Sequence, residues 1–328
     1  MIIKDNFKKI NNSQKNSTAM APFVSLVVPN YNGRHLLPLF FQSLSCTRYH
    51  NYEIILVDNA SEDDSIEFAK KACNDIKIVE SIENNGFGSA VNKGMVQAKG
   101  DYIVLVNTDI LFTTNWLDKL VESAQEKPKA GIIGALPVKS EYKDVIVSFP
   151  QPRYVNITAV SAATVLIKRE VIAKIGLFDE NFFMYCDDTD YCWRANLAGF
   201  DITYDREAIV YHLGGGSGSS SEKLRFERLK SGFYFIIKHF GLNAMLYAGK
   251  SYMVKPIIVS LFSTNKRKRL INALKWNIMN INSTRQSRND IYTNRRISKL
   301  HFYKKIKQEI RIHRANKRYY MKMQKFIG

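Results

Sequence analysis

Polar side chains that could bind a ligand gather at three points of the N-terminal half, each directly after an apolar run. The three groups are Pro29-Asn30-Tyr31-Asn32, Asp58-Asn59 and Asn107-Thr108-Asp109. The apolar runs read as buried strands, and open α/β sheets bind ligands beyond the carboxyl ends of their strands. We therefore expect the three groups to meet in one crevice. Carboxylates in such a crevice can accept hydrogen bonds from a base or ribose, or hold a divalent cation.

Two further groups could do chemistry in the C-terminal half. Asp187, Asp188 and Asp190 open a predicted helix, where a carboxylate can act as a general base toward a hydroxyl. The alternative is that these acids only favour the helix dipole, and Asp190 fits that alternative well. His212 ends a predicted strand, where a neutral imidazole could bind manganese or simply be a satisfied core or loop residue.

The elements that must position these groups alternate between strands and helices. Strands are expected at 24–28, 53–57, 76–79 and 102–106, and helices at 35–45, 61–73, 86–98 and 116–126. Continuous apolar strands separated by helices are typical of a mainly parallel sheet that is covered on both faces. Ser61 is the expected N-cap of its helix, with Asp64 three residues on as its capping-box partner.

The second half is less regular. Strands are expected at 132–135, 145–149, 159–167 and 208–212, and helices at 169–175, 187–199 and 222–240. A glycine-rich loop, 214–218, separates the last strand from the last of these helices.

Charge divides the chain of 328 residues into unequal parts. From residue 243 onward there are 21 Lys and Arg against two acids, a net charge of +19, whereas residues 1–242 are close to neutral. We predict a disordered lead-in at 1–21, an α/β domain at 22–242 and a basic helical tail at 243–328. Lys250 and Lys255 interrupt the apolar stretch at 244–262, which favours an interfacial helix over a membrane-spanning one.

Six motifs, in order, resemble those of family 2 glycosyltransferases, and of the rhamnosyltransferase-like branch in particular. They are Val24 to Gly33, Val57 to Ser61, Asn84 to Gly94, Leu105 to Asp109, Gly176 to Arg194, and Val210 to Gly215. The resemblance covers about residues 23–240 and implies a GT-A fold, a Rossmann-like and mainly parallel sheet flanked by helices. It also implies transfer of a sugar, with inversion, from a nucleotide diphosphate sugar.

The same resemblance implies roles for particular residues. Asp188 would be the general base of a single displacement, and Asp109 and His212 would bind Mn²⁺ or Mg²⁺ to offset the charge of the leaving diphosphate. The expected donor-binding residues are Pro29, Tyr31, Asn32, Asp58, Asn85, Gly86, Asn92, Asn107, Thr108 and Asp109. Trp193 is expected to pack in the core.

Three positions depart from the family pattern. Asn107 stands where the family often has a first aspartate, so Asp109 alone can be a charged metal ligand. Asp187 replaces the usual glutamate, which puts any role specific to that longer side chain in doubt. Ala162 stands where a glycine is common, and its methyl group could narrow the donor or acceptor site.

The partners are only partly indicated. The expected acceptor is a lipid-linked or polymeric saccharide of the cell surface. The donor sugar is left open, with dTDP-linked rhamnose first and UDP-linked galactose, glucose or an N-acetylhexosamine as alternatives. Four cysteines without a CxxC pair favour reduced thiols and a cytoplasmic location. The tail then suggests peripheral attachment to an anionic membrane, with self-association as its other role.

Two other function classes fit the sequence less well. The basic tail with its interleaved aromatic residues also suits nucleic acid, although any segment of such charge binds DNA without specificity. Because the motifs lie in the near-neutral part, we expect no specific nucleic-acid partner. A dinucleotide-dependent oxidoreductase is disfavoured because Pro29 to Gly33 supplies no GxGxxG turn after the first strand.

Overall fold

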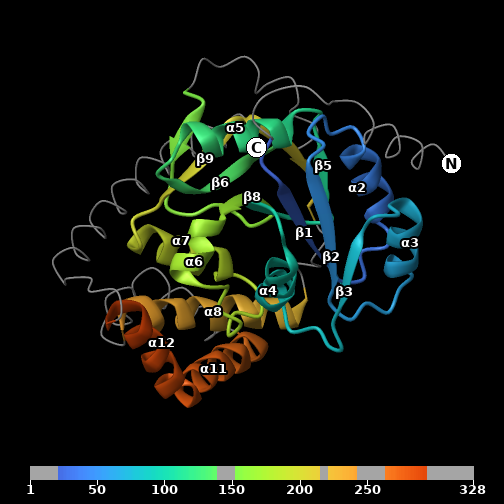
Figure 1. The fold of residues 1–328 in the computed structure, drawn as a ribbon. Helices are drawn as coiled ribbons and strands as arrows, with labels where there is room; N and C mark the ends of the chain where they lie inside the picture. Colours follow the sequence, from blue (N-terminus) through green and yellow to red (C-terminus); the bar gives the residue numbers. More distant parts are fainter. Residues whose placement is uncertain (1–20, 139–151, 215–220, 242–262, 294–328) are drawn as a thin grey trace.

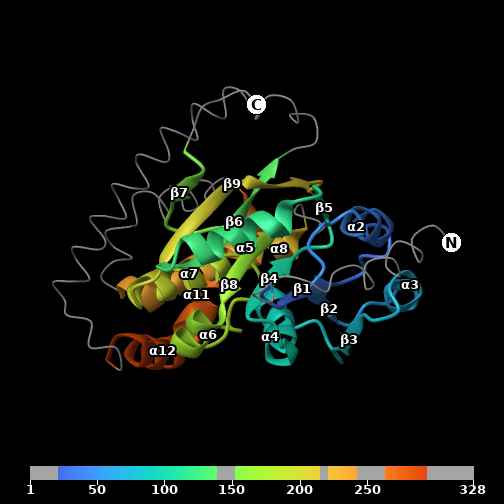
Figure 2. The same ribbon diagram turned by 45° about the horizontal axis from the view of Figure 1, so that its top comes forward.

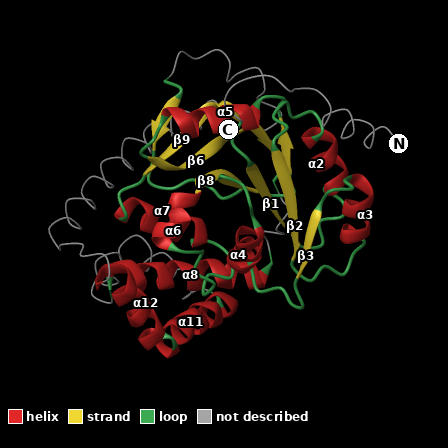
Figure 3. Ribbon diagram, viewed as in Figure 1, coloured by secondary structure: helices red, strands yellow, loops and turns green. Residues whose placement is uncertain are grey.

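The computed structural model describes residues 21–138, 152–214, 221–241 and 263–293, which fold around one nine-stranded sheet (Figure 1; Figure 3). The strand order is β3-β2-β1-β4-β8-β6-β9-β5, with β7 paired to β9. Residues 1–20 of the predicted lead-in, the predicted strand at 145–149 and the apolar stretch at 244–262 lie outside the described residues.

The first half of the sheet is parallel, as predicted. It consists of β1 (Val24–Asn30), β2 (Tyr52–Asp58), β3 (Lys77–Glu80) and β4 (Tyr102–Val106). The register places Asn30 opposite Asp58, so two of the predicted polar groups are neighbours at the carboxyl edge.

The second half of the sheet is mixed rather than parallel. Strand β8 (Thr164–Lys168) runs antiparallel to both β4 and β6 (Ala130–Val138), while β9 (Asp201–His212) is parallel to β6. The short strands β5 (Ile110–Phe112) and β7 (Tyr154–Asn156) pair antiparallel with β9. A strand buried on both faces is apolar whether it runs parallel or antiparallel to its neighbours, so the sequence pattern could not predict the direction of β8.

Helices cover both faces of the sheet, as predicted. One hydrophobic cluster packs α2 (Leu37–Leu44), α3 (Ser65–Ala72) and α5 (Trp116–Glu126) on one face. A second packs α4 (Phe87–Gln97), α6 (Arg169–Ile175) and α7 (Asp187–Leu197) on the other. Figure 2 shows α2 and α4 on opposite sides of β1 and β2. Burial of these apolar faces, at about 25 cal/mol per Å², is the main force that holds the layers together.

Two local predictions are corrected. Ser61 is not a helix N-cap: α3 begins only at Ser65, whose backbone N–H bonds to Asp63, and Ser61 donates instead to Asp58. The strand predicted at 159–167 begins at Thr164, because the preceding residues leave the sheet and the backbone N–H of Asn107 bonds to the carbonyl of Ala163.

The described part of the tail packs on the domain. Helix α8 (Glu222–Phe240), the last helix of the predicted domain, packs against the rest of the domain on one side and against the tail helices α11 (Thr264–Met279) and α12 (Ile281–Thr293) on the other (Figure 1). Phe233 of α8 forms a small hydrophobic cluster with Leu270 and Ala273 of α11. Among the helices that the structure describes, none combines the length and apolar character needed to cross a membrane.

Candidate active site

The carboxylate of Asp58 lies where the paired strands β1 and β2 reach their C-terminal ends. Asn30 donates its side-chain amide to Asp58 Oδ1 at 2.9 Å, and Ser61 donates its backbone N–H and its hydroxyl to the same carboxylate. Asp58 is only 2% exposed, so burial of the carboxylate depends on these donors. Sequence reasoning missed Asn30 and Ser61 as partners, although the parallel pairing of their strands was the available signal.

The neighbouring predicted donor-binding residues hold the two loops together. The side-chain oxygen of Asn32 accepts from the backbone N–H of Glu62, and its own backbone, at φ 50°, donates to Ser61. Pro29 is half-buried in β1, while the ring of Tyr31 is 51% exposed. Tyr31 is therefore available to a ligand at this edge, and the donor contacts of all three residues stay predictions.

Asp109 and His212 come together from segments 103 residues apart. The pairing of β5 with β9 places Ile110 opposite His212, and His212 Nε2 lies 3.1 Å from Asp109 Oδ2. The hydrogen bond to Asp109 is the main cause that raises the pKa of His212. This proximity of a carboxylate and an imidazole is what two ligands of one cation require.

The same edge holds buried oxygen atoms without a partner among the described residues. Asp109 Oδ1 and Asn107 Oδ1 are two of them, and Asn30 and Asn59 contribute two more. Unpaired buried acceptors are rare and point to a missing donor or cation. A divalent cation fits them, because hard cations take oxygen ligands from carboxylates and amides.

The number of protein ligands is small. No group of three or more His, Cys, Asp or Glu side chains in the described residues could hold a metal ion. A cation at Asp109 and His212 would therefore depend on phosphate oxygens and water for its other ligands, as Mg²⁺ sites on nucleotides commonly do.

The acidic pair Asp187 and Asp188 opens α7 after a strained turn. Tyr185 and Cys186 both have left-handed backbones, at φ 68° and 63°, which non-glycine residues seldom adopt. Such strain persists only where the surroundings impose it, and it clusters at functional sites. Asp187 is buried at 6% exposure, whereas Asp188 is half-buried and accepts from Thr189 at Oδ1.

Burial changes the protonation of this pair. Desolvation, helped by the charge of Asp188, raises the pKa of Asp187 to about 7. Desolvation also raises the pKa of Asp188, although the backbone N–H groups of Thr189 and Ala162 oppose the shift. A carboxylate with a raised pKa is a stronger base than an exposed one, which suits proton abstraction from a hydroxyl.

One segment connects the acidic pair to the candidate metal ligands. The carbonyl of Ala163 accepts from the backbone N–H of Asn107 at 2.9 Å, and the N–H of Ala162 lies at the carboxylate of Asp188. Asn107 and Asp188 therefore flank the same few residues, although 81 positions separate them in the chain. The methyl group of Ala162 is buried at this junction.

Gly86 joins the start of α4 to the loop before the acidic pair. Its φ is 90°, and a Cβ there would lie 2.1 Å from the carbonyl oxygen of Phe183. That oxygen accepts from the backbone N–H of Phe87. Gly86 is thus required by a close backbone approach, a role beyond the ligand binding predicted for it.

We expect Gly86→Ala to lower the free energy of unfolding by about 2 kcal/mol or more, because it adds both backbone strain and a steric clash. Gly232→Ala is the matched control, since Gly232 lies in α8 and a Cβ there meets nothing within 4 Å. Alanine should stabilise that helix slightly. Urea denaturation of both variants measures the difference, and equal midpoints would contradict the close approach at Gly86.

Two more of the predicted donor residues, Asn85 and Asn92, have protein partners. Asn92 donates to the carbonyl of Phe178 and to Glu180, and accepts from the backbone N–H of Phe178. Both ends of its amide are thus used to attach α4 to the loop before α7. Asn85 is exposed and donates to Glu83. The ligand contacts predicted for Asn85 and Asn92 remain predictions.

A buried charge cluster fastens α7 to α8. Asp190 is fully buried and forms ion pairs with Arg194 at 2.7 Å and Lys238 at 2.6 Å, while His239 Nε2 lies 2.8 Å from its Oδ1. Lys238 also pairs with Asp179. Sequence reasoning took Asp190 for an acid that only favours the dipole at the helix N-terminus. The structure instead makes it the centre of this cluster.

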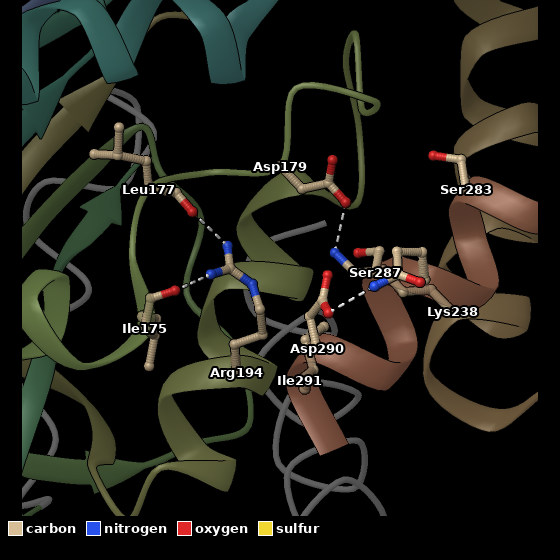
Figure 4. Close-up of a pocket in the computed structure, with 10 residues that line it drawn as sticks. Ile175, Leu177, Asp179, Arg194, Lys238, Ser283, Ser287, Asp290 and Ile291 are labelled. Atoms are coloured by element: carbon tan, nitrogen blue, oxygen red, sulfur yellow. Dashed lines mark hydrogen bonds and ion pairs between the residues drawn. The ribbon is translucent and has the colours of Figure 1, made fainter. Parts of the chain in front are cut away.

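A cavity of about 450 Å³ borders this cluster, between the loop before α7, α8 and α12 (Figure 4). Arg194, on α7, donates to the carbonyls of Ile175 and Leu177 and so attaches α7 to the end of α6 and the loop that follows it. Trp193 packs against Phe235 and Phe240 of α8, in agreement with the predicted packing role.

Comparison with known proteins bears on this arrangement of an acidic pair, a candidate metal pair and a strand-end aspartate. Residues 25–176 match the model of Glycosyl transferase family 2. The chain carries a family 2 glycosyltransferase domain. The match agrees with the family that the motifs predicted, and the two aspartates Asp58 and Asp109 lie within the matched residues.

Relatives of this glycosyltransferase extend the match. N-acetylglucosaminyl-diphospho-decaprenol L-rhamnosyltransferase of Mycobacterium tuberculosis is 25% identical over 235 residues, covering 59% of this chain and 76% of that protein. An uncharacterized glycosyltransferase of Rickettsia typhi is 27% identical, covering 65% and 72%. An uncharacterized protein of Sinorhizobium fredii is 26% identical, and the match spans only 26% of its length.

A solved structure supports the fold. The mannosyltransferase PcManGT from Pyrobaculum calidifontis, in complex with GDP-Man and Mn²⁺, superposes with a TM-score of 0.55 over 92% of this chain and 91% of that one. The identity is 15%, so the likeness concerns the fold alone. The predicted GT-A fold class is thereby confirmed for this glycosyltransferase.

Proposed function

We propose that this chain transfers a hexose or deoxyhexose, with inversion, from a nucleotide diphosphate sugar to a hydroxyl of a saccharide acceptor in cell-surface polysaccharide or glycolipid assembly. The observation that carries the proposal is the junction at Ala162 and Ala163, where the backbone contacts both Asp188 and the segment of Asp109. A base and a cation site on either side of one junction suit a sugar held between a diphosphate and an acceptor.

Asp188 is the proposed general base. Thr189 donates its backbone N–H and its hydroxyl to Oδ1, which leaves Oδ2 to accept the proton of the acceptor hydroxyl. Inverting transfer is a single displacement and needs no second carboxylate as nucleophile. Because Asp187 is buried beside Asp188, only one carboxylate of the pair is accessible to a substrate.

Asp109 and His212 are the proposed ligands of Mn²⁺ or Mg²⁺, and Asn107 contributes an oxygen that has no partner among the described residues. A divalent cation there would offset the negative charge that develops on the leaving diphosphate. The imidazole favours Mn²⁺ over Mg²⁺. Asp58 and Tyr31 are the proposed contacts of the nucleoside, at the adjacent strand ends.

Rhamnose from a dTDP donor is the first candidate, supported by the rhamnosyltransferase name of one relative. That name also supports a lipid-linked acceptor, and the basic tail is then the proposed contact with the cytoplasmic face of the membrane. Turnover with a panel of dTDP-, UDP- and GDP-sugars, with and without Mn²⁺, tests the proposal. Absence of transfer and of donor hydrolysis across the panel would contradict it.

Asp109→Ala should weaken Mn²⁺ binding and lower turnover by about a hundredfold, since it removes the only charged ligand. Electron paramagnetic resonance of free Mn²⁺ in the presence of nucleoside diphosphate measures the binding without any turnover. Asp101→Ala, at an exposed position before β4, is the control and should change neither quantity. Unchanged Mn²⁺ affinity in Asp109→Ala would contradict the proposal that Asp109 is a metal ligand.

The pH dependence of kcat/KM should report the acidic pair. Only an ionised Asp188 can accept a proton, and desolvation raises the pKa of Asp188, so activity should rise with pH through an apparent pKa above the ordinary value for aspartate. Asp187→Asn removes the neighbouring charge and should shift the profile to lower pH. A profile that is flat from pH 5 to 8 would show that no group of raised pKa acts as the base.

A further inference from the structure

Helix α11 presents two different faces. Leu270, Ala273 and Asn277 are buried against α8, and the Asn277 side chain donates to the carbonyl of Lys230 at 3.2 Å. The opposite face carries large apolar side chains in water: Ile271, Ile278 and Met279 are 55%, 70% and 74% exposed. A helix that packs on its domain by one face and exposes three large apolar residues on the other is built for a second contact.

Basic residues share that outer face. Lys268, Ile271, Lys275 and Ile278 follow one another at spacings of three and four, which places them on one stripe. Lys268 and Lys275 are exposed, as is Arg267 one turn before Ile271. The helix as a whole has five Lys and Arg and no acid. Apolar and basic side chains interleaved on one face are typical of helices that lie in a membrane interface.

The outer face of α11 suits a lipid surface better than a second copy of this chain. A second copy would bring two acid-free, positively charged faces together, which costs free energy. Beyond α12, residues 294–328 add 12 Lys and Arg against one acid, which strengthens the attraction to a negative surface. Ile82 and Val96 are also exposed, but they are single residues on other elements, as is ordinary for a protein surface.

We propose that the outer face of α11 docks on an anionic lipid surface. Ile271, Ile278 and Met279 enter the headgroup layer, and Lys268 and Lys275 contact lipid phosphates. Figure 1 shows α11 at the margin of the molecule, with α8 between it and the helices that cover the sheet, so a flat surface can reach this face. The inference deepens the proposed function, since a membrane contact through α11 holds the domain beside lipid-linked acceptors.

The test uses the full chain, without substrate, and vesicles of phosphatidylglycerol and phosphatidylcholine. Lys268→Ser with Lys275→Ser should weaken binding about 25-fold, at roughly fivefold for each lysine. Ile271→Ser with Ile278→Ser should weaken it on the order of tenfold. Ile82→Ser with Val96→Ser is the matched control and should leave binding unchanged.

A depth measurement separates docking by α11 from attraction by the rest of the tail. Tryptophan placed by Ile278→Trp should be quenched by brominated lipid more strongly than tryptophan placed by Val96→Trp, after subtraction of the parent signal. Equal quenching would overturn the proposal, as would vesicle binding that is unaffected by the serine pairs. A dimer in solution that Ile278→Ser abolishes would also overturn it, because the face would then be a protein interface. Since no readout involves turnover, failure here is distinct from failure of the transferase proposal.

Discussion

Asp188→Asn should lower kcat by about a thousandfold while the protein remains folded, because an amide of nearly the same shape cannot accept the acceptor's proton. Positioned general bases contribute 10²- to 10⁴-fold, so this is the largest effect expected on activity. Transfer from the donor identified by the nucleotide-sugar panel measures it. Affinity for Mn²⁺ and nucleoside diphosphate should be unchanged, since the sites proposed for both lie on the other side of the Ala162–Ala163 junction.

Asp187→Asn is the matched control for that substitution. It changes the neighbouring carboxylate, which is buried, and should move the pH profile without removing the base. A thousandfold loss in Asp187→Asn together with near-normal turnover in Asp188→Asn would exchange the two roles. Loss of nucleotide binding in Asp188→Asn would instead indicate that α7 had shifted, and the assignment of Asp188 as base would fail.

Asp190→Asn should lower the free energy of unfolding by about 3–5 kcal/mol, because it leaves Lys238 and Arg194 buried without this carboxylate. Such a loss is a large fraction of the 5–15 kcal/mol that stabilises a typical protein. Urea denaturation at pH 7 measures it. The surface pair Arg34–Asp64 supplies the control, since Asp64→Asn removes an exposed ion pair and should cost less than about 1 kcal/mol.

The effect of Asp190→Asn should depend on pH. Burial alone would raise the pKa of Asp190, but the charges of Lys238 and Arg194 and the hydrogen bond with His239 hold that pKa well below its usual range. A lowered pKa stabilises the folded state at pH above about 4, and the gain is lost as the pH falls through the folded-state value. Wild type and Asp190→Asn should therefore converge in acid. A constant difference from pH 7 to pH 3 would show that the charge of Asp190 is not what stabilises the fold.

The cluster around Asp190 also links α8 to the helix that carries the acidic pair. Lys238 and His239 belong to α8, which packs on α11, while Asp190 lies two residues beyond Asp188 on α7. Desolvation lowers the pKa of His239 to about 4, so this histidine is neutral at pH 7 and contributes a hydrogen bond rather than a charge. The position of the candidate base thus rests on contacts with a helix that follows the sheet.

Local chemistry made much of the fold predictable. The helices at Trp116–Glu126, Arg169–Ile175 and Glu222–Phe240 and the strand Tyr102–Val106 have the predicted bounds, because apolar periodicity and flanking glycines or polar residues mark them along the chain. The parallel order of the first four strands followed from the alternation with helices. Ser61 was misassigned because its nearest partner, Asp58, competes for the hydroxyl that a helix N-terminus would otherwise use.

The sequence by itself determined which residues could act: a family pattern and the ends of strands singled out Asp58, Asp109, Asp188 and His212. Only the tertiary structure decided which of them meet. The antiparallel pairing of β5 with β9 and the departure of Ala162 and Ala163 from the sheet depend on contacts between distant residues, which leave no local signal in the sequence. The same holds for Asp190, whose spacing fits any acidic helix start. Its partners on α8 lie 48 and 49 residues away, and burial of all these charges together gives Asp190 its role.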